Sequence, residues 1–252
     1  MLSNVKTHIH QEVATITFFH PKSNSLPGEL LRELTYQITS AGNNPIVKVI
    51  IIKSEGDKTF CGGASFDDLI AIKNFEDGKK FFLTLAEVIN AMRNVPKFII
   101  ARIQGKAVGG GVGLAASADY AFAVKDASIR LSELALGIGP FVVGPAVERK
   151  IGNSAFTSLT INPTVWKTAE WAREKGLYAE VVDSVAEMDA AIQSLAEKLA
   201  HSNPEAMAQL KKVMWSGTEH WDKLLVERAE MSGRFLLSEF TQKALKSLVT
   251  NK

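Results

Sequence analysis

Three short segments of the chain carry residues whose types and spacing could do chemistry. The first, GKAVGGGVGLAA at residues 105–116, directly follows a continuous apolar run that is typical of a buried strand. Glycines at a strand-to-helix junction leave backbone N–H groups bare at the positive end of a helix. Such amides suit an anion, either a bound phosphate or a negative charge that develops during a reaction.

The second segment, TFCGGASFDDL at residues 59–69, also follows a buried apolar run. Gly62 and Gly63 precede Ala64 and again offer bare backbone amides. Two such turns at the carboxyl ends of neighbouring strands could direct two N–H donors at one oxygen atom. Because removing one donor from an oxyanion site costs on the order of 3–4 kcal/mol of barrier, this geometry could carry much of a catalytic effect. An ordinary glycine-rich turn is the alternative for this segment alone.

The third segment, SELALGIGP at residues 132–140, contains Glu133 between Leu131 and Leu134. Apolar neighbours and a following Gly-Pro-rich loop could remove water from this carboxylate and raise its pKa towards the working pH. A general acid or base would result. Without the other two segments, a solvated surface charge is the usual interpretation of a single glutamate such as Glu133.

Other sites of chemistry are poorly supported. Residues 111–116 match a G-x-G-x-x-A dinucleotide fingerprint, but the match falls late in the chain instead of in its first β/α unit. The chain has no G-x-S-x-G, H-E-x-x-H, P-loop or C-x-x-C motif. Its five histidines are scattered, so we predict no metal site.

The elements that must position these segments alternate along the chain. Apolar residues recur every second position in a strand and every third or fourth position in an amphipathic helix. By this measure, strands are predicted at 12–20, 45–54, 97–105 and 119–124, and helices at 30–42, 81–92 and 112–117. Strand–helix alternation of this kind indicates stacked or parallel β/α units.

The last part of the chain has a different pattern and is predicted to be wholly helical from about residue 185. Helices whose apolar faces are large relative to the core of their own chain often pack on a neighbouring subunit. The alternative is that they cover the core of their own chain. We therefore predict a core at residues 1–190, for binding and catalysis, and a helical trimerisation region at 191–252.

Composition limits the class of protein. The 252 residues are 46% apolar and carry a net charge of +2 without a basic cluster, which gives no reason to expect a nucleic acid as partner. Cys61 is the only cysteine, so an internal disulfide is excluded and a reducing compartment is favoured. The amino-terminal residues lack the apolar region of a secretory signal, and no run is long enough to span a bilayer. A soluble cytoplasmic enzyme without membrane attachment is expected.

Taken together and in this order, the segments resemble the crotonase (enoyl-CoA hydratase/isomerase) superfamily. HPKSNSL is similar to its early H-P-x-x-N-A-L turn, FCGGASFDDL to its F-x-A/G-G-A-D-x-x-x-L loop, and SELALGIGP to its P-E-x-x-L-G-x-x-P motif. GKAVGGGVGLAASADYAFA and NPEAMAQLKKVM match two further motifs. The resemblance implies an α/β crotonase-type spiral of repeated ββα units with a C-terminal helical region, assembled as a homotrimer or as a hexamer of paired trimers.

The resemblance also assigns roles. Ala64 and Gly110 would hold the thioester oxygen of an acyl-CoA through their N–H groups, and Glu133 would be the general acid/base. Coenzyme A enters as part of the substrate, so no separate cofactor is expected. The residues expected to bind the acyl-CoA are Lys22, Ser23, Ser25, Ala64, Ser65, Phe66, Gly109, Gly110, Phe240 and Lys243. The arginine that follows the lysine of this late motif in the family is Ala244 here.

One departure from the family bears on the reaction. Hydratases of this family use two glutamates, and Gly113 stands at the position of the one that is absent here. The overall sequence nevertheless looks closest to methylglutaconyl-CoA hydratase, so hydration or dehydration of a branched enoyl-CoA is the first expectation. A single-glutamate double-bond isomerase, an acyl-CoA decarboxylase and a non-catalytic acyl-CoA-binding or interaction protein are the alternatives. Arg130 could pair with a carboxylate on such a substrate, although an arginine without a role at a strand end is the simpler interpretation.

Overall fold

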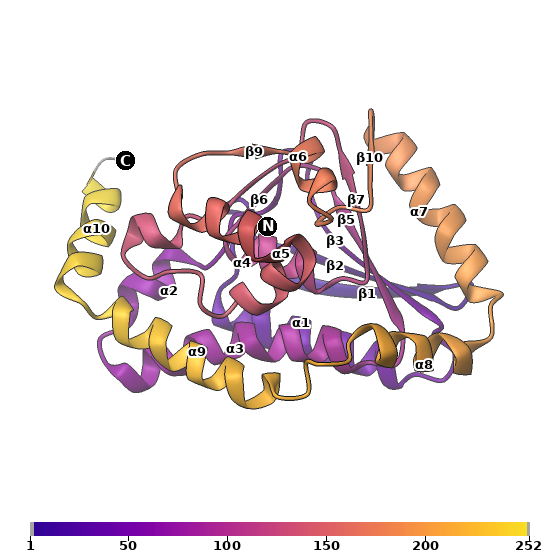
Figure 1. Cartoon of the computed structure of the whole chain (residues 1–252). Coiled ribbons are helices and arrows are strands. Elements are labelled where there is room, and N and C mark those ends of the chain that lie inside the picture. The colour runs from indigo at the N-terminus through magenta and orange to yellow at the C-terminus, as the bar shows by residue number, and fades with distance from the viewer. Residues whose placement is uncertain (1–2, 251–252) are drawn as a thin grey trace.

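The computed structural model describes residues 3–250, which form two β-sheets surrounded by helices (Figure 1). Within that range, a six-stranded sheet has the order β1-β2-β3-β5-β7-β10 and a four-stranded sheet the order β4-β6-β8-β9. The strands of the larger sheet are β1 (Asn4–His10), β2 (Val13–Phe19), β3 (Val49–Ser54), β5 (Phe98–Ile103), β7 (Tyr120–Val124) and β10 (Glu180–Val182). Those of the smaller sheet are β4 (Thr59–Cys61), β6 (Lys106–Val108), β8 (Ser128–Arg130) and β9 (Lys167–Thr168).

The helices connect and cover these sheets. They are α1 (Gly28–Asn43), α2 (Phe66–Ala71), α3 (Phe75–Asn94), α4 (Gly110–Ser117), the 3-10 helix η1 (Glu133–Leu136), α5 (Gly144–Ile161), α6 (Ala169–Glu174), α7 (Val185–Ala200), α8 (Pro204–Met214), α9 (Trp221–Leu236) and α10 (Glu239–Thr250). Helix α9 lies alongside α3, α7 packs against β5 and β7, and α10 packs against α2 and η1 (Figure 1).

A repeated ββα unit organises the chain. In β3–β4–α3, β5–β6–α4 and β7–β8–α5, the first strand joins the larger sheet and the second joins the smaller one. Both β4–β6 and β6–β8 pair in parallel, so the carboxyl ends of these short strands lie at one edge. This arrangement confirms the fold class implied by the resemblance, and the turns that follow β4, β6 and β8 are the segments singled out in the sequence.

The long strands follow from their composition. Five of the six residues of β3 are buried, because this β-branched strand lies between β2 and β5 and is covered on both faces. In β2 the buried residues include Ile16 and Phe18, which are fully enclosed. The strands and helices predicted from periodicity are all present.

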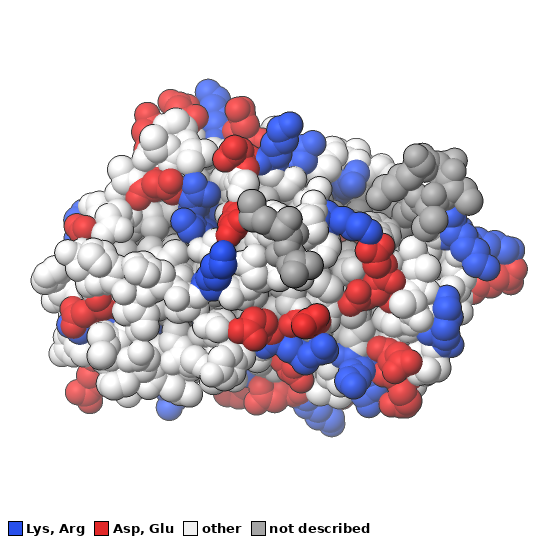
Figure 2. All heavy atoms as spheres, turned by 180° about the vertical axis from the view of Figure 1, so that it is seen from behind, with Lys and Arg blue, Asp and Glu red and all other residues white. Residues whose placement is uncertain are grey.

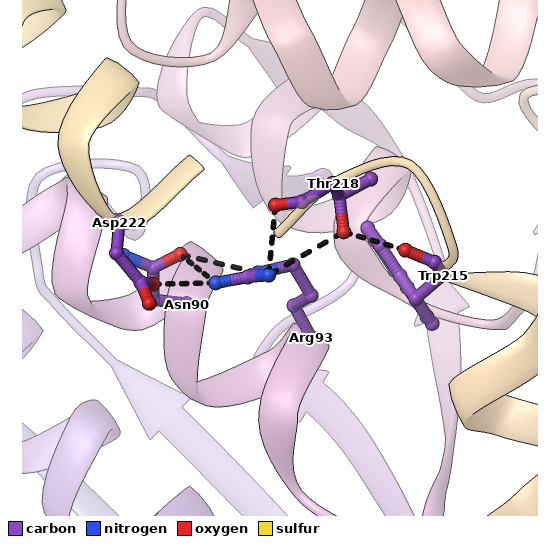
Figure 3. Close-up of polar contacts among 5 residues, drawn as sticks. All are labelled: Asn90, Arg93, Trp215, Thr218 and Asp222. Atoms are coloured by element: carbon purple, nitrogen blue, oxygen red, sulfur yellow. Dashed lines mark hydrogen bonds and ion pairs between the residues drawn. The ribbon is translucent and has the colours of Figure 1, made fainter. Parts of the chain in front are cut away.

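Buried polar groups fasten the C-terminal helices to the core. The Arg93 guanidinium on α3 donates to the Thr218 carbonyl oxygen at 2.9 Å and to the Asp222 carboxylate at 2.5 Å, while its Nε donates to Asn90 (Figure 3). We call these residues, with Asn90, the Arg93 cluster. It attaches the start of α9 to α3, and so helps to fix α9 against α3 and the following α10 against α2 and η1.

A second group, the Asp119 cluster, comprises Asp119, Lys211 and Trp215 with the backbone around them. The Lys211 Nζ lies 2.9 Å from the Asp119 carboxylate and also donates to the carbonyl oxygens of Met92 and Lys97. The same carboxylate accepts from the Trp215 indole and the Ile99 amide, each at 2.8 Å. Both charged side chains are almost wholly buried, and each has three polar partners.

The distribution of charged side chains on the surface agrees with the absence of a basic cluster in the sequence. On the face that Figure 2 shows, lysines and arginines are interspersed with aspartates and glutamates. Across the described residues, no helix has the length and apolar character needed to cross a membrane. Residues 3–250 likewise contain no group of three or more histidine, cysteine or acidic side chains arranged to hold a metal ion.

Candidate active site

The two glycine-rich turns meet at the carboxyl ends of β4 and β6. Leu26 forms a parallel bridge with Ala64, in which the Leu26 amide donates to Gly63 and its carbonyl oxygen accepts from Ser65. Because Leu26 uses both of its backbone groups on the flanking residues, the Ala64 N–H points away from Leu26. Gly110 begins α4, so its N–H has no acceptor within the helix.

Contact between the turns requires glycine. Gly63 has φ +86°, and a Cβ atom there would lie 2.9 Å from the Val108 carbonyl oxygen and 3.7 Å from the Gly110 nitrogen. A side chain at this position would therefore separate the turn of Ala64 from the turn of Gly110. The close approach places two unbonded backbone donors in neighbouring turns.

Glu133 lies directly beside these turns. A Cβ atom on Gly109 (φ +52°) would be only 2.9 Å from the Glu133 Oε1, so glycine is needed here to admit the carboxylate. The Gly109 amide donates to the Arg130 carbonyl oxygen at 2.9 Å, which ties the turn to the strand that leads to Glu133. The structure thus brings together Ala64, Gly110 and Glu133.

The environment of the carboxylate changes its acidity. The Glu133 Oε2 is buried and, among the described residues, has no hydrogen-bond partner. Burial raises the pKa of Glu133 from 4.5 to about 7, although backbone hydrogen bonds of Glu133 and Ser132 partly oppose the shift. A carboxyl group with this pKa can both give and accept a proton near neutral pH. Cys61, in contrast, is buried with its pKa raised to about 12, which excludes a thiolate nucleophile.

A cavity of about 370 Å³ opens at this edge of the smaller sheet. It is lined by residues next to the two turns and Glu133, namely Gly62, Val108 and Ser132, and by Phe66, Arg130, Ala135, Leu136, Pro163, Thr164, Ala244 and Ser247. A larger and mainly apolar cavity of about 560 Å³ lies between α5 and α9. Neither cavity is lined by Ala64, Gly110 or Glu133 themselves. The smaller one is lined by residues within two positions of each of them and the larger one is not, so we assign the chemistry to the smaller cavity.

The residues expected to contact coenzyme A occupy several environments. Lys22 and Phe66 are exposed, and Lys22 pairs with Asp67 at 2.5 Å. The Ser23 carbonyl oxygen accepts from the Gly62 amide, whereas the buried Ser25 hydroxyl lies 2.8 Å from His20 Nδ1. The buried Ser65 hydroxyl caps α2 by accepting from the Asp68 amide. Ser23 and Ser65 therefore also hold the Ala64 turn in place, whereas the bond of Ser25 lies within the turn that precedes Leu26.

The C-terminal pair, Phe240 and Lys243, lies on α10. A Cβ atom on Gly137 would be 2.5 Å from the Phe240 ring, so this exposed ring packs beside the helix that starts at Glu133. Lys243 is largely exposed and pairs with Glu239 at 2.5 Å. The roles of both in binding coenzyme A, and of a neighbouring subunit in supplying them, stay predictions.

The position of the missing glutamate is closed by a side chain that sequence reasoning missed. Gly113 is buried in α4, and a Cβ atom there would lie 2.4 Å from Cγ1 of Val143, just before α5. Val143 therefore takes the space that a side chain at position 113 would need. Gly111, likewise inside α4, lies against Cys61, so residues 111–116 do not form the open turn that a dinucleotide pyrophosphate requires.

Trp166, just before β9, contacts two cations beside the smaller sheet. Its ring lies 4.4 Å from the guanidinium carbon of Arg130 and 5.3 Å from the Lys106 ammonium. A tryptophan preceding a short strand carries no sequence signal for this stacking, because the cations come from β6 and β8.

Comparisons with known proteins place the chain in one family. Residues 8–248 match the family described as Enoyl-CoA hydratase/isomerase. The chain is 28% identical over 254 residues to the short-chain-enoyl-CoA hydratase of Clostridium acetobutylicum, covering 100% of this chain and 96% of that protein. It is 32% identical over 200 residues to the mitochondrial methylglutaconyl-CoA hydratase of Homo sapiens, covering 78% of this chain and 58% of that protein.

The fold is shared with solved structures. The enoyl-CoA hydratase from Bacillus halodurans superposes with a TM-score of 0.89 at 23% identity, over 96% of this chain and 99% of that one. The family match over nearly the whole chain and the shared fold lead to one conclusion: the chain belongs to the crotonase, or enoyl-CoA hydratase/isomerase, superfamily.

Proposed function

We propose that the protein acts on an acyl-CoA thioester through an enolate, with Ala64 and Gly110 as the oxyanion donors and Glu133 as the acid/base. The observation that carries this proposal is the Glu133 carboxyl, with its pKa of about 7, beside two backbone donors in neighbouring turns. Proton transfer at the carbon next to a thioester builds negative charge on the thioester oxygen. Preorganised amides stabilise this charge more in the transition state than in the ground state.

The leading reaction is hydration or dehydration of an enoyl-CoA. Water adds its oxygen to the β-carbon and loses a proton to the Glu133 carboxylate, and the same carboxyl group then gives that proton to the α-carbon of the enolate. Relatives named short-chain-enoyl-CoA hydratase and methylglutaconyl-CoA hydratase support this choice, and the second supports a branched substrate. Lys22, Ser65, Phe66, Phe240 and Lys243 are the proposed coenzyme A contacts beyond the two turns.

A second reaction, double-bond isomerisation, is favoured by the Gly113–Val143 contact. Hydration is easiest with two carboxylates, one to activate water and one to protonate carbon. Because Val143 fills the space beside Gly113, no acidic side chain can enter there without rearrangement. One carboxylate is sufficient to move a proton between two carbons of a bound enolate.

Assembly and compartment are inferred mainly from the family and the sequence. We infer a homotrimer or a hexamer of paired trimers, in keeping with the apolar side chains exposed on α8 and α9, among them Leu210, Val213 and Phe235. A cytoplasmic location stays a prediction, since the human relative is named as mitochondrial.

Product identification from three CoA esters tests the proposal. The purified protein is incubated with crotonyl-CoA, 3-hexenoyl-CoA and 3-methylglutaconyl-CoA, and the products are identified by liquid chromatography and mass spectrometry. A 3-hydroxyacyl product supports hydration, a shifted double bond supports isomerisation, and loss of CO₂ would assign decarboxylation instead. Binding of the esters without any product would replace catalysis with a role as an acyl-CoA-binding protein.

A further inference from the structure

Arg130 is attached to the candidate active site through its backbone and its side chain. It is the last residue of β8, and its carbonyl oxygen accepts a hydrogen bond from the amide of Gly109, the residue before the proposed oxyanion donor Gly110. Its side chain lines the cavity of about 370 Å³, together with Val108 and Ser132, which adjoin Gly109 and Glu133. A positive charge is therefore fixed within the cavity where the thioester is proposed to react.

This charge has no protein partner of opposite sign. The Arg130 Nε is buried and has no hydrogen-bond partner, and no carboxylate among residues 3–250 pairs with the guanidinium. Its described interaction is the contact with the Trp166 ring, 4.4 Å from the guanidinium carbon. A buried polar group without a partner costs free energy, and Arg130 lines a cavity in which a bound anion would supply partners to the other N–H groups of its guanidinium.

The stacking leaves the guanidinium suited to one kind of ligand. The guanidinium carbon lies over the Trp166 ring, and no acceptor among residues 3–250 is bonded to the N–H donors, so these remain for a planar or tetrahedral oxyanion. We propose that Arg130 binds an anionic oxygen group of the acyl-CoA. Two parts of such a molecule carry one: a carboxylate at the far end of the acyl chain, or a phosphate of coenzyme A. This inference rests on the proposed acyl-CoA substrate.

Lys106 provides a matched control. Its ammonium contacts the same Trp166 ring at 5.3 Å, but the residue is exposed and does not line the cavity. Replacing Lys106 removes a cation from the ring without changing the cavity wall. An effect that belongs to the cavity must therefore appear in Arg130→Gln and be absent from Lys106→Gln.

Equilibrium binding of unreactive thioesters tests the inference separately from catalysis. Isothermal titration calorimetry compares glutaryl-CoA, pentanoyl-CoA and S-pentanoyl-N-acetylcysteamine, which carry respectively a carboxylate and phosphates, phosphates only, and neither. Each is titrated into the wild type, Arg130→Gln, Arg130→Lys and Lys106→Gln. Arg130→Gln is expected to raise the Kd of a ligand whose anion Arg130 binds by roughly 10–100-fold. Arg130→Lys should raise it by less, because lysine keeps the positive charge but lacks the paired N–H donors of the guanidinium.

The pattern across ligands identifies the anion. Loss confined to glutaryl-CoA assigns Arg130 to an acyl carboxylate and thereby the substrate to the dicarboxylic class. Equal loss with both CoA esters, with the N-acetylcysteamine ester unchanged, assigns it to a phosphate. Unchanged binding of both CoA esters, or equal loss with all three ligands, would overturn the inference while leaving the proposed function standing. If the wild type bound neither CoA ester, both would fail.

Discussion

Two regions of the molecule bury charged side chains in opposite ways. In the Asp119 cluster, the carboxylate and the Lys211 ammonium meet at 2.9 Å, and each has two further partners from the backbone or from Trp215. In the candidate active site, the Glu133 Oε2 and the Arg130 Nε are buried without any partner among residues 3–250. Because both regions belong to one chain, the overall stability or composition of the protein cannot explain why the buried charges have partners in one region and lack them in the other.

The difference separates what holds the fold from what is available for a ligand. A buried charge without a partner costs free energy, and a folded protein retains one chiefly where binding or reaction uses it. A buried charge with all its partners fastens elements together, as the Arg93 cluster does for α3 and α9 (Figure 3). Removal of a charge should therefore change activity in one region and stability in the other.

The largest expected effect is on activity at Glu133. Glu133→Gln keeps the shape and removes the transferable proton, so kcat should fall by about 10²–10⁴-fold on whichever ester is turned over. The free energy of unfolding at pH 8 should not fall, because no protein partner loses its charge. Steady-state kinetics and urea unfolding provide the two measurements, and Glu174→Gln, on the exposed part of α6, is the control. Retention of most activity would remove Glu133 from the mechanism.

The opposite result is expected at Lys211. Lys211→Met leaves the Asp119 carboxylate buried without its cation, which should lower the free energy of unfolding by about 3–5 kcal/mol. The kcat of the folded protein should stay at the wild-type value. Urea unfolding measures the loss, and Lys212→Met, at the adjacent exposed position, should show little of it.

A double variant distinguishes the pair from a packing effect. Adding Asp119→Asn to Lys211→Met removes the stranded charge and should recover part of the lost stability. A Lys211→Met protein as stable as the wild type would show that the two regions do not differ as described.

The sequence predicted the architecture better than it predicted these contacts. Strands β2, β3, β5 and β7 of the larger sheet and helices α1 and α3 were predicted because runs such as Val49–Ser54 and stripes such as Leu30, Leu34 and Ile38 are long enough to show their periods. Strands β1 and β10 and helix α5 were not predicted. The strands of the smaller sheet have at most three residues, which is too short for a period, so β4, β6, β8 and β9 were not predicted.

The same limit applies to the sites. Ala64, Gly110 and Glu133 were singled out by residue type and by resemblance, and the structure places them together. Trp215 and Asp119 are 96 positions apart, and no local pattern connects them. The Gly113–Val143 contact depends on how α4 packs against α5, which sequence spacing does not reveal. Contacts that need tertiary packing were missed in both regions.

The smallest expected effect is a pH dependence of stability that belongs to Glu133 alone. Its pKa is about 7 in the folded chain against an ordinary 4.5, so between these values the native state binds more protons than the unfolded state. Stability from this group must therefore fall as pH rises from 4.5 to about 7 and stay low above that. Subtracting the wild-type free energy of unfolding from that of Glu133→Gln, at steps from about pH 5 to about pH 8, cancels the other titrations. The difference should grow in favour of the variant up to about pH 7 and then level off, whereas a constant difference would mean that Glu133 is as well solvated as any surface carboxylate.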